Sequence, residues 1–319
     1  MHLPDFPWDT LAAAKHNASA HPGGIVDLSV GTPVDPTPAV IREALCEASD
    51  APGYPTVHGT PQVRQAAADW LSRRLGVSAE PADVLPLIGT KEFVAWLPTL
   101  LGLGPDDVVA SPAIAYPTYR VGAMVAGCRT ATVGQSAALT WLNSPANPTG
   151  EVLGVQALRD VVTAARADGS IVVSDECYIE LGWESEAFSV LHPDVCDGDH
   201  TGLLAVHSLS KRSNMAGYRF GFAVGDPRLI ASLLQVRKHL GMMVPLPVGL
   251  RTIEEGKEKQ LVGMTVVLPK GMNSAGLGNF DHKAFVRDLL ELKLRPDALN
   301  ARLAKQFGAD EAKTLAAEL

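Results

Sequence analysis

Residues 171–178 read IVVSDECY, and residues 203–221 read LLAVHSLSKRSNMAGYRFG. Each stretch begins as a short apolar run and ends in polar residues, which is typical of a buried strand that leads into a loop. In open α/β sheets, ligands bind at the carboxyl ends of the parallel strands. We therefore expect Asp175 and Lys211, which follow these two runs, to lie at the edge of a sheet where a ligand binds.

The same rhythm extends along the chain on both sides of these stretches. From about residue 60 to residue 235, short apolar runs alternate with longer helical patterns, which indicates an α/β fold with a mostly parallel sheet sandwiched by helices. Strands are predicted at 84–88, 108–111, 140–143, 171–174, 203–207 and 220–224. Helices are predicted at 62–75, 91–101, 156–167 and 228–239.

Composition divides the chain into three parts. Residues 1–53 are rich in Pro, Gly and Ala and are predicted to form an N-terminal arm and part of a small domain, with a helix near 38–48. Residues 54–248 carry the alternating pattern and form the large domain. Residues 249–319 change character and are predicted to be an atypical helical segment, with short helices at 284–294, 297–307 and 310–319.

The overall composition excludes several classes of function. The chain has 319 residues, of which 46% are hydrophobic, so it can bury a substantial core. Its net charge of -8 argues against binding to nucleic acid or to anionic membranes. Its N-terminus lacks the pattern of a signal peptide, and its four cysteines form no Cys-x-x-Cys pair. We therefore expect a cytoplasmic protein without a metal site.

Three short motifs carry the chemistry, although each has an ordinary reading by itself. Asp175 alone is a helix cap or a turn residue, Lys211 alone is a surface lysine, and residues 143–150 (NSPANPTG) alone are a turn. Their order along the chain, each at the end of a predicted strand, favours one shared site instead.

That combination resembles the fold-type I aminotransferases, which depend on pyridoxal 5′-phosphate (PLP). The resemblance implies that Lys211 carries PLP as a Schiff base and that Asp175 pairs with the pyridinium nitrogen of its ring. A carboxylate there keeps the ring protonated and able to accept electrons, and a partly desolvated lysine can act as a general base. The resemblance also implies that Asn147 and Tyr178 contact the phenolic oxygen of the cofactor, Tyr178 being counted with Lys211 and Asp175 as catalytic.

Further residues match the same family pattern. Ser208, Ser210 and Arg219 lie on one loop and would bind the phosphate, together with Gly89, Thr90 and Lys91, which open a helix whose N-terminal amides favour an anion. Tyr116 resembles the aromatic residue that stacks on the ring, with Tyr119 as a substitute. Tyr54 resembles a tyrosine that reaches the phosphate of a neighbouring subunit, which implies a homodimer with shared active sites. Gly31 matches the loop that closes on the substrate carboxylate.

From about residue 3 to residue 248, the chain resembles bacterial succinyldiaminopimelate aminotransferases. The similarity implies amino transfer between glutamate and N-succinyl-2-amino-6-oxopimelate, in the synthesis of lysine and diaminopimelate. Residues 249–319 do not resemble the C-terminal small domain of that family, which contains an arginine that clamps the substrate's α-carboxylate. The sequence does not single out that arginine among Arg251, Arg287, Arg295 and Arg302.

Two other functions remain open. One is a different reaction of the same cofactor, either a C–S lyase type of elimination or the transamination of other amino acids. The other is a protein that binds PLP without turnover, because its carboxylate-binding domain is altered.

Overall fold

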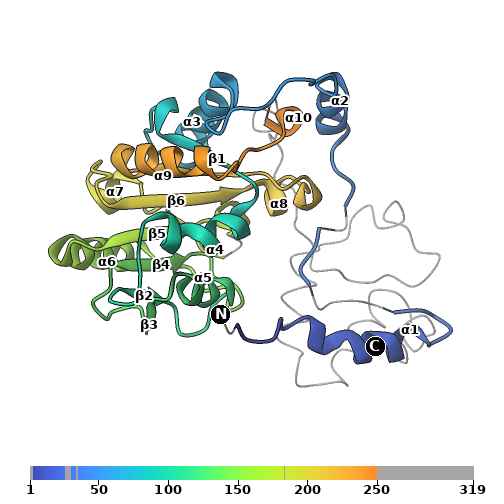
Figure 1. Ribbon diagram of the computed structural model, residues 1–319, viewed down its shortest axis with the longest axis horizontal. Coiled ribbons are helices and arrows are strands. Elements are labelled where there is room, and N and C mark those ends of the chain that lie inside the picture. Colours follow the sequence, from blue (N-terminus) through green and yellow to red (C-terminus); the bar gives the residue numbers. More distant parts are fainter. Residues whose placement is uncertain (1–2, 26–29, 34, 183, 250–319) are drawn as a thin grey trace. The chain divides into compact units, whose positions relative to one another are not determined.

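The computed structural model describes residues 3–25, 30–33, 35–182 and 184–249 (Figure 1). The helices predicted at 284–294, 297–307 and 310–319 lie outside the described residues, as do the four candidate arginines between Arg251 and Arg302. The proposed division of the chain at residues 53 and 248 stays a prediction.

The described residues form a seven-stranded sheet with the strand order β1-β7-β6-β5-β4-β2-β3. Strands β2, β3, β4, β5 and β6 pair in parallel, whereas β7 is antiparallel to both of its neighbours, β6 and β1. The strands are β1 (Val84–Leu87), β2 (Val108–Ser111), β3 (Arg129–Thr132), β4 (Leu139–Asn143), β5 (Ile171–Asp175), β6 (Leu203–Ser208) and β7 (Gly221–Gly225).

The strand directions bring several loops to one edge of this sheet. In the register, Asn143 of β4 lies beside Asp175 of β5, and Ser208 of β6 lies beside Gly221 of β7. Because β7 runs in the opposite direction, its first residue lies level with the last residues of β1 and β6. The loop before β7 and the loops after β1, β4, β5 and β6 therefore open at the same edge.

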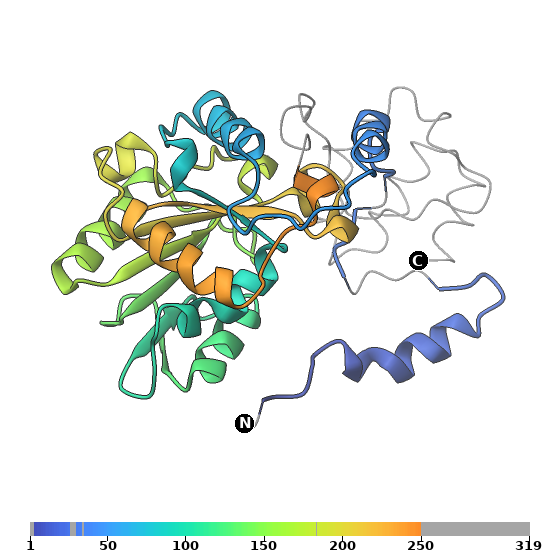
Figure 2. The same ribbon diagram turned by 45° about the horizontal axis from the view of Figure 1, so that its top comes forward.

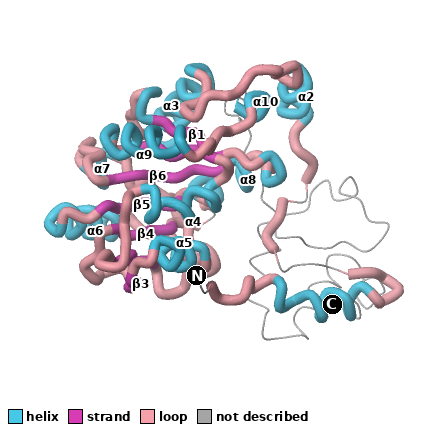
Figure 3. The backbone as a smooth tube through the Cα atoms, viewed as in Figure 1, coloured by secondary structure: helices cyan, strands magenta, loops and turns pink. Residues whose placement is uncertain are grey.

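Helices cover both faces of the sheet, as the cyan helices around the magenta strands show in Figure 3. On one face, α4, α5 and α9 pack around Trp141, Val173 and Val206. On the other, α3 and α6 pack around Val172 and Phe222. Figure 2 shows the blue α3 and the orange α9 on opposite sides of the sheet. The helices are α1 (Ala12–Ser19), α2 (Ala39–Glu47), α3 (Pro61–Leu75), α4 (Thr90–Leu100), α5 (Thr118–Ala126), α6 (Val155–Asp168), α7 (Pro193–Cys196), α8 (Leu209–Arg212), α9 (Pro227–His239) and α10 (Leu246–Gly249).

Local sequence explains where the longer helices begin and end. Thr60 caps α3 by accepting a hydrogen bond from the Val63 amide at 3.2 Å, and Pro61 occupies the first helical position. The helix ends at Gly76, which has a φ of 64° that suits glycine. Asp226 and Pro227 start α9 in the same way, with the Asp226 carboxylate 2.8 Å from the Arg228 amide.

The fold class predicted from the sequence is confirmed, and the strands and helices predicted before residue 249 agree with the structure to within one residue at each end. The edge strand β3, the helices α1 and α5, and the four-residue helices α7, α8 and α10 were not predicted. The edge strand β3 (Arg129–Thr132) is mostly exposed, so it needs no apolar run, and no element was predicted over the segment that forms α5. The antiparallel direction of β7 was not predicted either, because pairing between distant strands leaves no local signal. Among the described residues, no helix is long and apolar enough to cross a membrane.

Candidate active site

Asp175 is the last residue of β5, and its carboxylate is buried with 4% of the residue exposed. The Tyr119 hydroxyl donates to Oδ2 at 2.8 Å, and the Cys177 thiol and amide donate to Oδ1 at 2.9 and 3.3 Å. No cationic side chain of the described residues forms an ion pair with it. The site therefore holds a buried carboxylate whose partners are all neutral donors.

Burial and hydrogen bonding act on this carboxylate in opposite directions. Burial raises the pKa of Asp175, while the bonds from Cys177 and Tyr119 lower it. A buried charge costs several kcal/mol, and each hydrogen bond to a charged group returns about 1.5–3 kcal/mol. The three donors thus offset much of the penalty but leave Asp175 in need of a cation, and a protonated ring nitrogen is one.

Packing holds the Tyr119 side chain in the orientation in which its hydroxyl donates to Asp175. Tyr119 is 1% exposed on α5, and its ring stacks on Trp141 of β4 with a centroid distance of 5.1 Å and an interplanar angle of 27°. Burial and the nearby Asp175 carboxylate raise the pKa of Tyr119, so the hydroxyl keeps its proton and donates. The stacking on Trp141 therefore keeps the Tyr119 hydroxyl directed at the Asp175 carboxylate.

Lys211 lies on α8, directly after β6, and its Nζ donates to the carbonyl oxygen of Gly31. Burial lowers the pKa of Lys211, and the neighbouring Cys177 thiol opposes this shift. Cys177 interacts electrostatically with Lys211 and hydrogen-bonds Asp175, so the three residues occupy one site. The structure thereby brings the predicted lysine, aspartate and Gly31 together.

Asn147 reaches this site through a second asparagine, Asn143, which is the last residue of β4. The Asn143 side chain accepts a hydrogen bond from the Asn147 amide at 2.7 Å and donates to the carbonyl oxygens of Asp175 at 2.8 Å and Pro145 at 3.1 Å. Asn143 is 5% exposed, so water does not replace these bonds. It ties the loop of Asn147 to the end of β5.

Replacing Asn143 with alanine should destabilise the fold, since it leaves buried backbone groups of β5 and of the Asn147 loop without partners. We expect a loss of roughly 1–3 kcal/mol in the free energy of unfolding. Chemical denaturation of Asn143→Ala measures it. Asn17→Ala, on the exposed surface of α1, is the control. Equal stability of the two variants would show that the link is dispensable.

Two further tyrosines line the same edge. Tyr116, at the end of the loop before α5, is half-buried and packs edge-on against Tyr119 with centroids 6.0 Å apart. Tyr178 follows Cys177 and interacts electrostatically with Asp175 and Tyr116. Burial raises the pKa of Tyr178, so its hydroxyl stays protonated and can donate a hydrogen bond.

Gly89 and Arg219 form a cradle beside these residues. Gly89 caps α4 with a φ of 72°, which favours glycine, and a Cβ added to it would lie 2.8 Å from Arg219 Cζ, so the guanidinium would have to shift. Arg219 donates to the Ala216 carbonyl oxygen at 2.9 Å and is otherwise exposed. Thr90 lies against Gly221, next to Ser208, which caps α8 by accepting from the Ser210 amide at 3.1 Å. A helix N-terminus, Ser208 and a guanidinium thus lie close together, as an anion site requires.

Two predicted residues lie apart from this group. The Lys91 ammonium sits 4.8 Å from the Phe6 ring centroid and 5.9 Å from that of Trp8, so its side chain points at the N-terminal arm. The Tyr54 side chain is 96% exposed. Their predicted roles in cofactor binding stay predictions.

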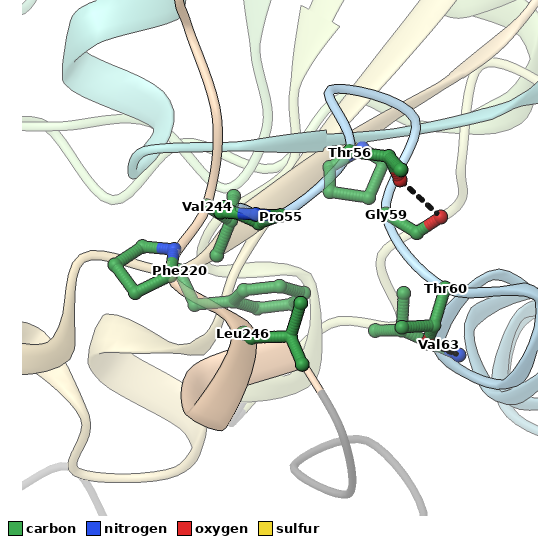
Figure 4. A pocket seen from close by; sticks show the side chains of 10 residues that line it. Pro55, Thr56, Gly59, Thr60, Val63, Phe220, Val244 and Leu246 are labelled. Atoms are coloured by element: carbon green, nitrogen blue, oxygen red, sulfur yellow. Dashed lines mark hydrogen bonds between the residues drawn. The ribbon is translucent and has the colours of Figure 1, made fainter. Parts of the chain in front are cut away.

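Figure 4 shows a pocket next to the loop after Tyr54, where the Thr56 hydroxyl donates to the Gly59 carbonyl oxygen at 3.0 Å. Its walls include Pro55, Val63, Phe220, Val244 and Leu246. No ionisable side chain lines it, so it offers no acid, base or anion-binding group, and the chemistry belongs to the edge around Asp175 and Lys211.

Three residues of the site escaped the sequence analysis. Asn143 had a usable signal, since it is a polar residue at a strand end. Tyr119 was considered only as a stacking aromatic, whereas its hydroxyl binds Asp175. Cys177 gave no signal, because a thiol two residues after a strand-end aspartate has no fixed role.

Comparisons with known proteins found similar sequences over the part of the chain that contains the site. A family model described as aminotransferase class I and II matches residues 24–253. A probable aminotransferase of Mycobacterium tuberculosis is 63% identical over 254 residues, which are 77% of this chain and 61% of that protein. The chain therefore spans less than two thirds of the length of that relative.

Two other similar proteins have more specific names. The 4-dedimethylamino-4-oxo-anhydrotetracycline transaminase of Streptomyces rimosus is 56% identical, over 77% of this chain and 70% of its own length. The solved structure of a probable N-succinyldiaminopimelate aminotransferase from Thermus thermophilus superimposes with a TM-score of 0.72 at 30% identity, over 80% of this chain and 74% of that one.

Proposed function

The chain belongs to the class I and II aminotransferases, and on that premise we propose that it moves an amino group between an amino acid and a 2-oxo acid. The observation that carries the proposal is the meeting of Lys211, Asp175 and the Asn143–Asn147 link at one sheet edge. These are the groups that amino transfer needs: a nucleophilic base, a carboxylate and an amide.

The family depends on PLP, and the described residues fit that cofactor. Asp175 is a buried carboxylate without a cationic partner in the described part of the chain, and Gly89 leaves room beside Arg219 for an anionic group. When bound, PLP supplies a protonated ring that accepts the electrons released when the substrate's Cα proton leaves. Asp175 would hold that ring nitrogen, and Arg219, Ser208, Ser210 and the amides of Gly89, Thr90 and Lys91 would hold the phosphate.

The chain's own residues account for the proton movements. Lys211 would hold the cofactor through its Nζ and, once displaced by the substrate amine, would move a proton to or from the substrate's Cα. Its lowered pKa increases the share of the neutral amine that can do so. Tyr178 and Asn147 would donate to the phenolic oxygen, and Tyr116 would cover the ring, since Tyr119 already stacks on Trp141.

Gly89→Ala should weaken the binding of PLP, because the added methyl group collides with the Arg219 guanidinium and displaces it. Losing one charge-assisted contact of about 1.5–3 kcal/mol corresponds to roughly a 10- to 100-fold rise in Kd. Fluorescence titration of the apoprotein with PLP measures it. Gly102→Ala is a matched control, since Gly102 also has a positive φ of 76° but nothing within 4 Å of the added Cβ. Unchanged affinity in Gly89→Ala would argue against the phosphate site.

For the substrates, we propose glutamate as amino donor and N-succinyl-2-amino-6-oxopimelate as acceptor. The likeness to the Thermus protein supports this choice. A second candidate acceptor is a ketone on a fused-ring polyketide, which the identity to the Streptomyces transaminase favours. The two differ sharply, since the first is a flexible polyanion and the second is a rigid ring system.

One experiment tests the reaction and separates these substrates. The purified full chain, loaded with PLP, is mixed with glutamate while the cofactor absorbance and the release of 2-oxoglutarate are followed. We expect glutamate to convert the cofactor to its amine form and one of the two acceptors to reverse the change. A protein that binds PLP yet ignores every amino donor would be the binding protein without turnover. Release of ammonia and pyruvate from a cysteine conjugate would instead identify a C–S lyase.

We further propose a homodimer in which Tyr54 contacts the partner's cofactor phosphate. The full exposure of this tyrosine in the single chain supports the proposal, because a large aromatic side chain gains little from pointing into water. Analytical ultracentrifugation of the wild type tests the assembly. A cytoplasmic location stays a prediction.

A further inference from the structure

A second carboxylate lies directly behind the first. Glu176 follows Asp175, and its amide continues the ladder by donating to the Val206 carbonyl oxygen at 2.9 Å. Because side chains alternate along a strand, Glu176 points to the face of α3, opposite to Asp175 and Tyr119. The residue is 1% exposed. Its Oε1 accepts hydrogen bonds from the Val190 amide at 2.8 Å and the Ser189 hydroxyl at 3.1 Å.

The other oxygen of Glu176 faces a buried histidine of the neighbouring strand. Oε2 lies 3.5 Å from Nε2 of His207, which is 2% exposed and immediately precedes Ser208 in β6. The His207 ring packs between Trp70 and Phe222, with centroid distances of 5.1 and 5.0 Å. Within the described residues, neither Oε2 nor either ring nitrogen of His207 makes a hydrogen bond, and a proton on Oε2 would allow it to donate to Nε2 across the 3.5 Å that separates them.

The charged groups around this pair are few. Asp175 faces the sheet's other side but is near enough to disfavour a negative charge on Glu176. Arg212 of α8 lies near His207 and disfavours a positive charge on it, while Arg212 itself is paired with Glu180 and stacked 4.4 Å from the Trp70 ring centroid. Both neighbours thus favour a pair in which Glu176 is an acid and His207 is neutral.

We propose that Glu176, held as a neutral carboxylic acid against His207, is a positioning residue for Asp175 in the role that the proposed function gives it. The pair joins the end of β5, which carries Asp175, to the end of β6, which leads to Ser208 and Lys211. A neutral Glu176 also spares Asp175 a like charge on the adjacent residue. Asp175 can then stay ionised beside the ring nitrogen of the cofactor.

The pH dependence of this arrangement has a definite sign. Burial raises the pKa of Glu176 from 4.5 to about 8, and burial lowers the pKa of His207 from 6.5 to about 3. A raised acid pKa means that the unfolded chain loses its proton first, so stability falls as the pH rises from 4.5 through about 8. The His207 contribution is complete above pH 6.5 and is lost progressively as the pH falls from 6.5 through about 3. Above pH 6.5, any loss of stability from this pair is therefore due to Glu176.

Glu176→Gln tests the proposal, because an amide resembles the protonated acid and cannot ionise. The thermal unfolding midpoint (Tm) and the cofactor absorbance of the PLP-loaded full chain are recorded from about pH 6 to about pH 9. We expect the wild-type Tm to fall as the pH rises toward about 8 and then level off, and the wild-type turnover to be lost with a midpoint near pH 8. Glu176→Gln should keep its neutral-pH turnover within about twofold and lack both changes. Glu80→Gln, on the exposed surface, should behave like the wild type.

Several results would overturn the proposal. One is an alkaline loss of the same size in Glu176→Gln and in the wild type. Another is a turnover in Glu176→Gln that is lower by tenfold or more at neutral pH, since an ionised Glu176 would then be required. A third is a change in Tm with no change in the pH profile of the cofactor absorbance, since that would leave the pair without influence on the site.

Infrared spectroscopy of the wild type supplies a measurement that does not depend on the variant. The carbonyl stretch of a protonated carboxylic acid should be present at neutral pH and should disappear near pH 8. Its absence at neutral pH would overturn the proposal even if Glu176→Gln did not fold. The infrared and thermal readouts need no turnover, so a chain that ignored every amino donor would refute the proposed function separately.

Discussion

Lys211→Ala should abolish the covalent attachment of PLP and reduce amino transfer by on the order of 10²–10⁴-fold, the range for loss of a general base. The reason is that the Nζ of Lys211 lies near Cys177, which hydrogen-bonds Asp175, and that its lowered pKa lets it act both as amine and as base. Reduction of the loaded protein with borohydride, followed by peptide mass spectrometry, should find the cofactor on the peptide that contains Lys211.

Two variants make this measurement specific. Lys238→Ala, on the exposed surface of α9, should retain the label and the turnover of the wild type. Lys211→Arg keeps the positive charge but removes the amine, so it should lose both the label and the reaction. If Lys211→Arg remained active, the residue would be needed only as a cation, and its assignment as the base would fail.

Asp175→Asn should lower kcat by about 10²–10³-fold with little change in KM, because it removes the charge that stabilises a protonated ring as electrons flow into it. The asparagine keeps the shape of the side chain, so the loss reports the charge. Stopped-flow absorbance of the half-reaction with glutamate measures the change. A kcat close to that of the wild type would exclude Asp175 as the partner of the ring nitrogen.

Removing the Tyr119 hydroxyl, which hydrogen-bonds Asp175, tests the role of this carboxylate with a smaller expected effect. Tyr119→Phe keeps the stacking on Trp141 and removes one of the donors to the carboxylate, worth about 1.5–3 kcal/mol. Its effect on kcat should be smaller than that of Asp175→Asn. In the protein without cofactor, Asp175→Asn should also raise the Tm at neutral pH, since burial has raised the pKa of Asp175 and the buried charge opposes folding.

Most of the strands and the longer helices could be predicted from local patterns in the sequence, and the reason is physical. A fully buried strand such as β1 is apolar along its length, and a helix such as α3 shows its cap, its apolar face and its terminal glycine within one segment. Such signals need no knowledge of the neighbours. The edge strand β3 gave none, because its side chains are mostly exposed and no core constrains them.

The sequence by itself determined the α/β class, the strand ends at which Asp175 and Lys211 lie, and the residues that carry the family resemblance. The tertiary structure alone decided that β7 runs antiparallel, which brings Arg219 to Gly89, and that Tyr119, Cys177 and Asn143 hold Asp175 and its loop in place. It also set Glu176 against His207 on the far face of the sheet. These contacts join residues of different strands and loops, so their energies depend on how the strands pair, and that pairing is absent from any single segment of the chain.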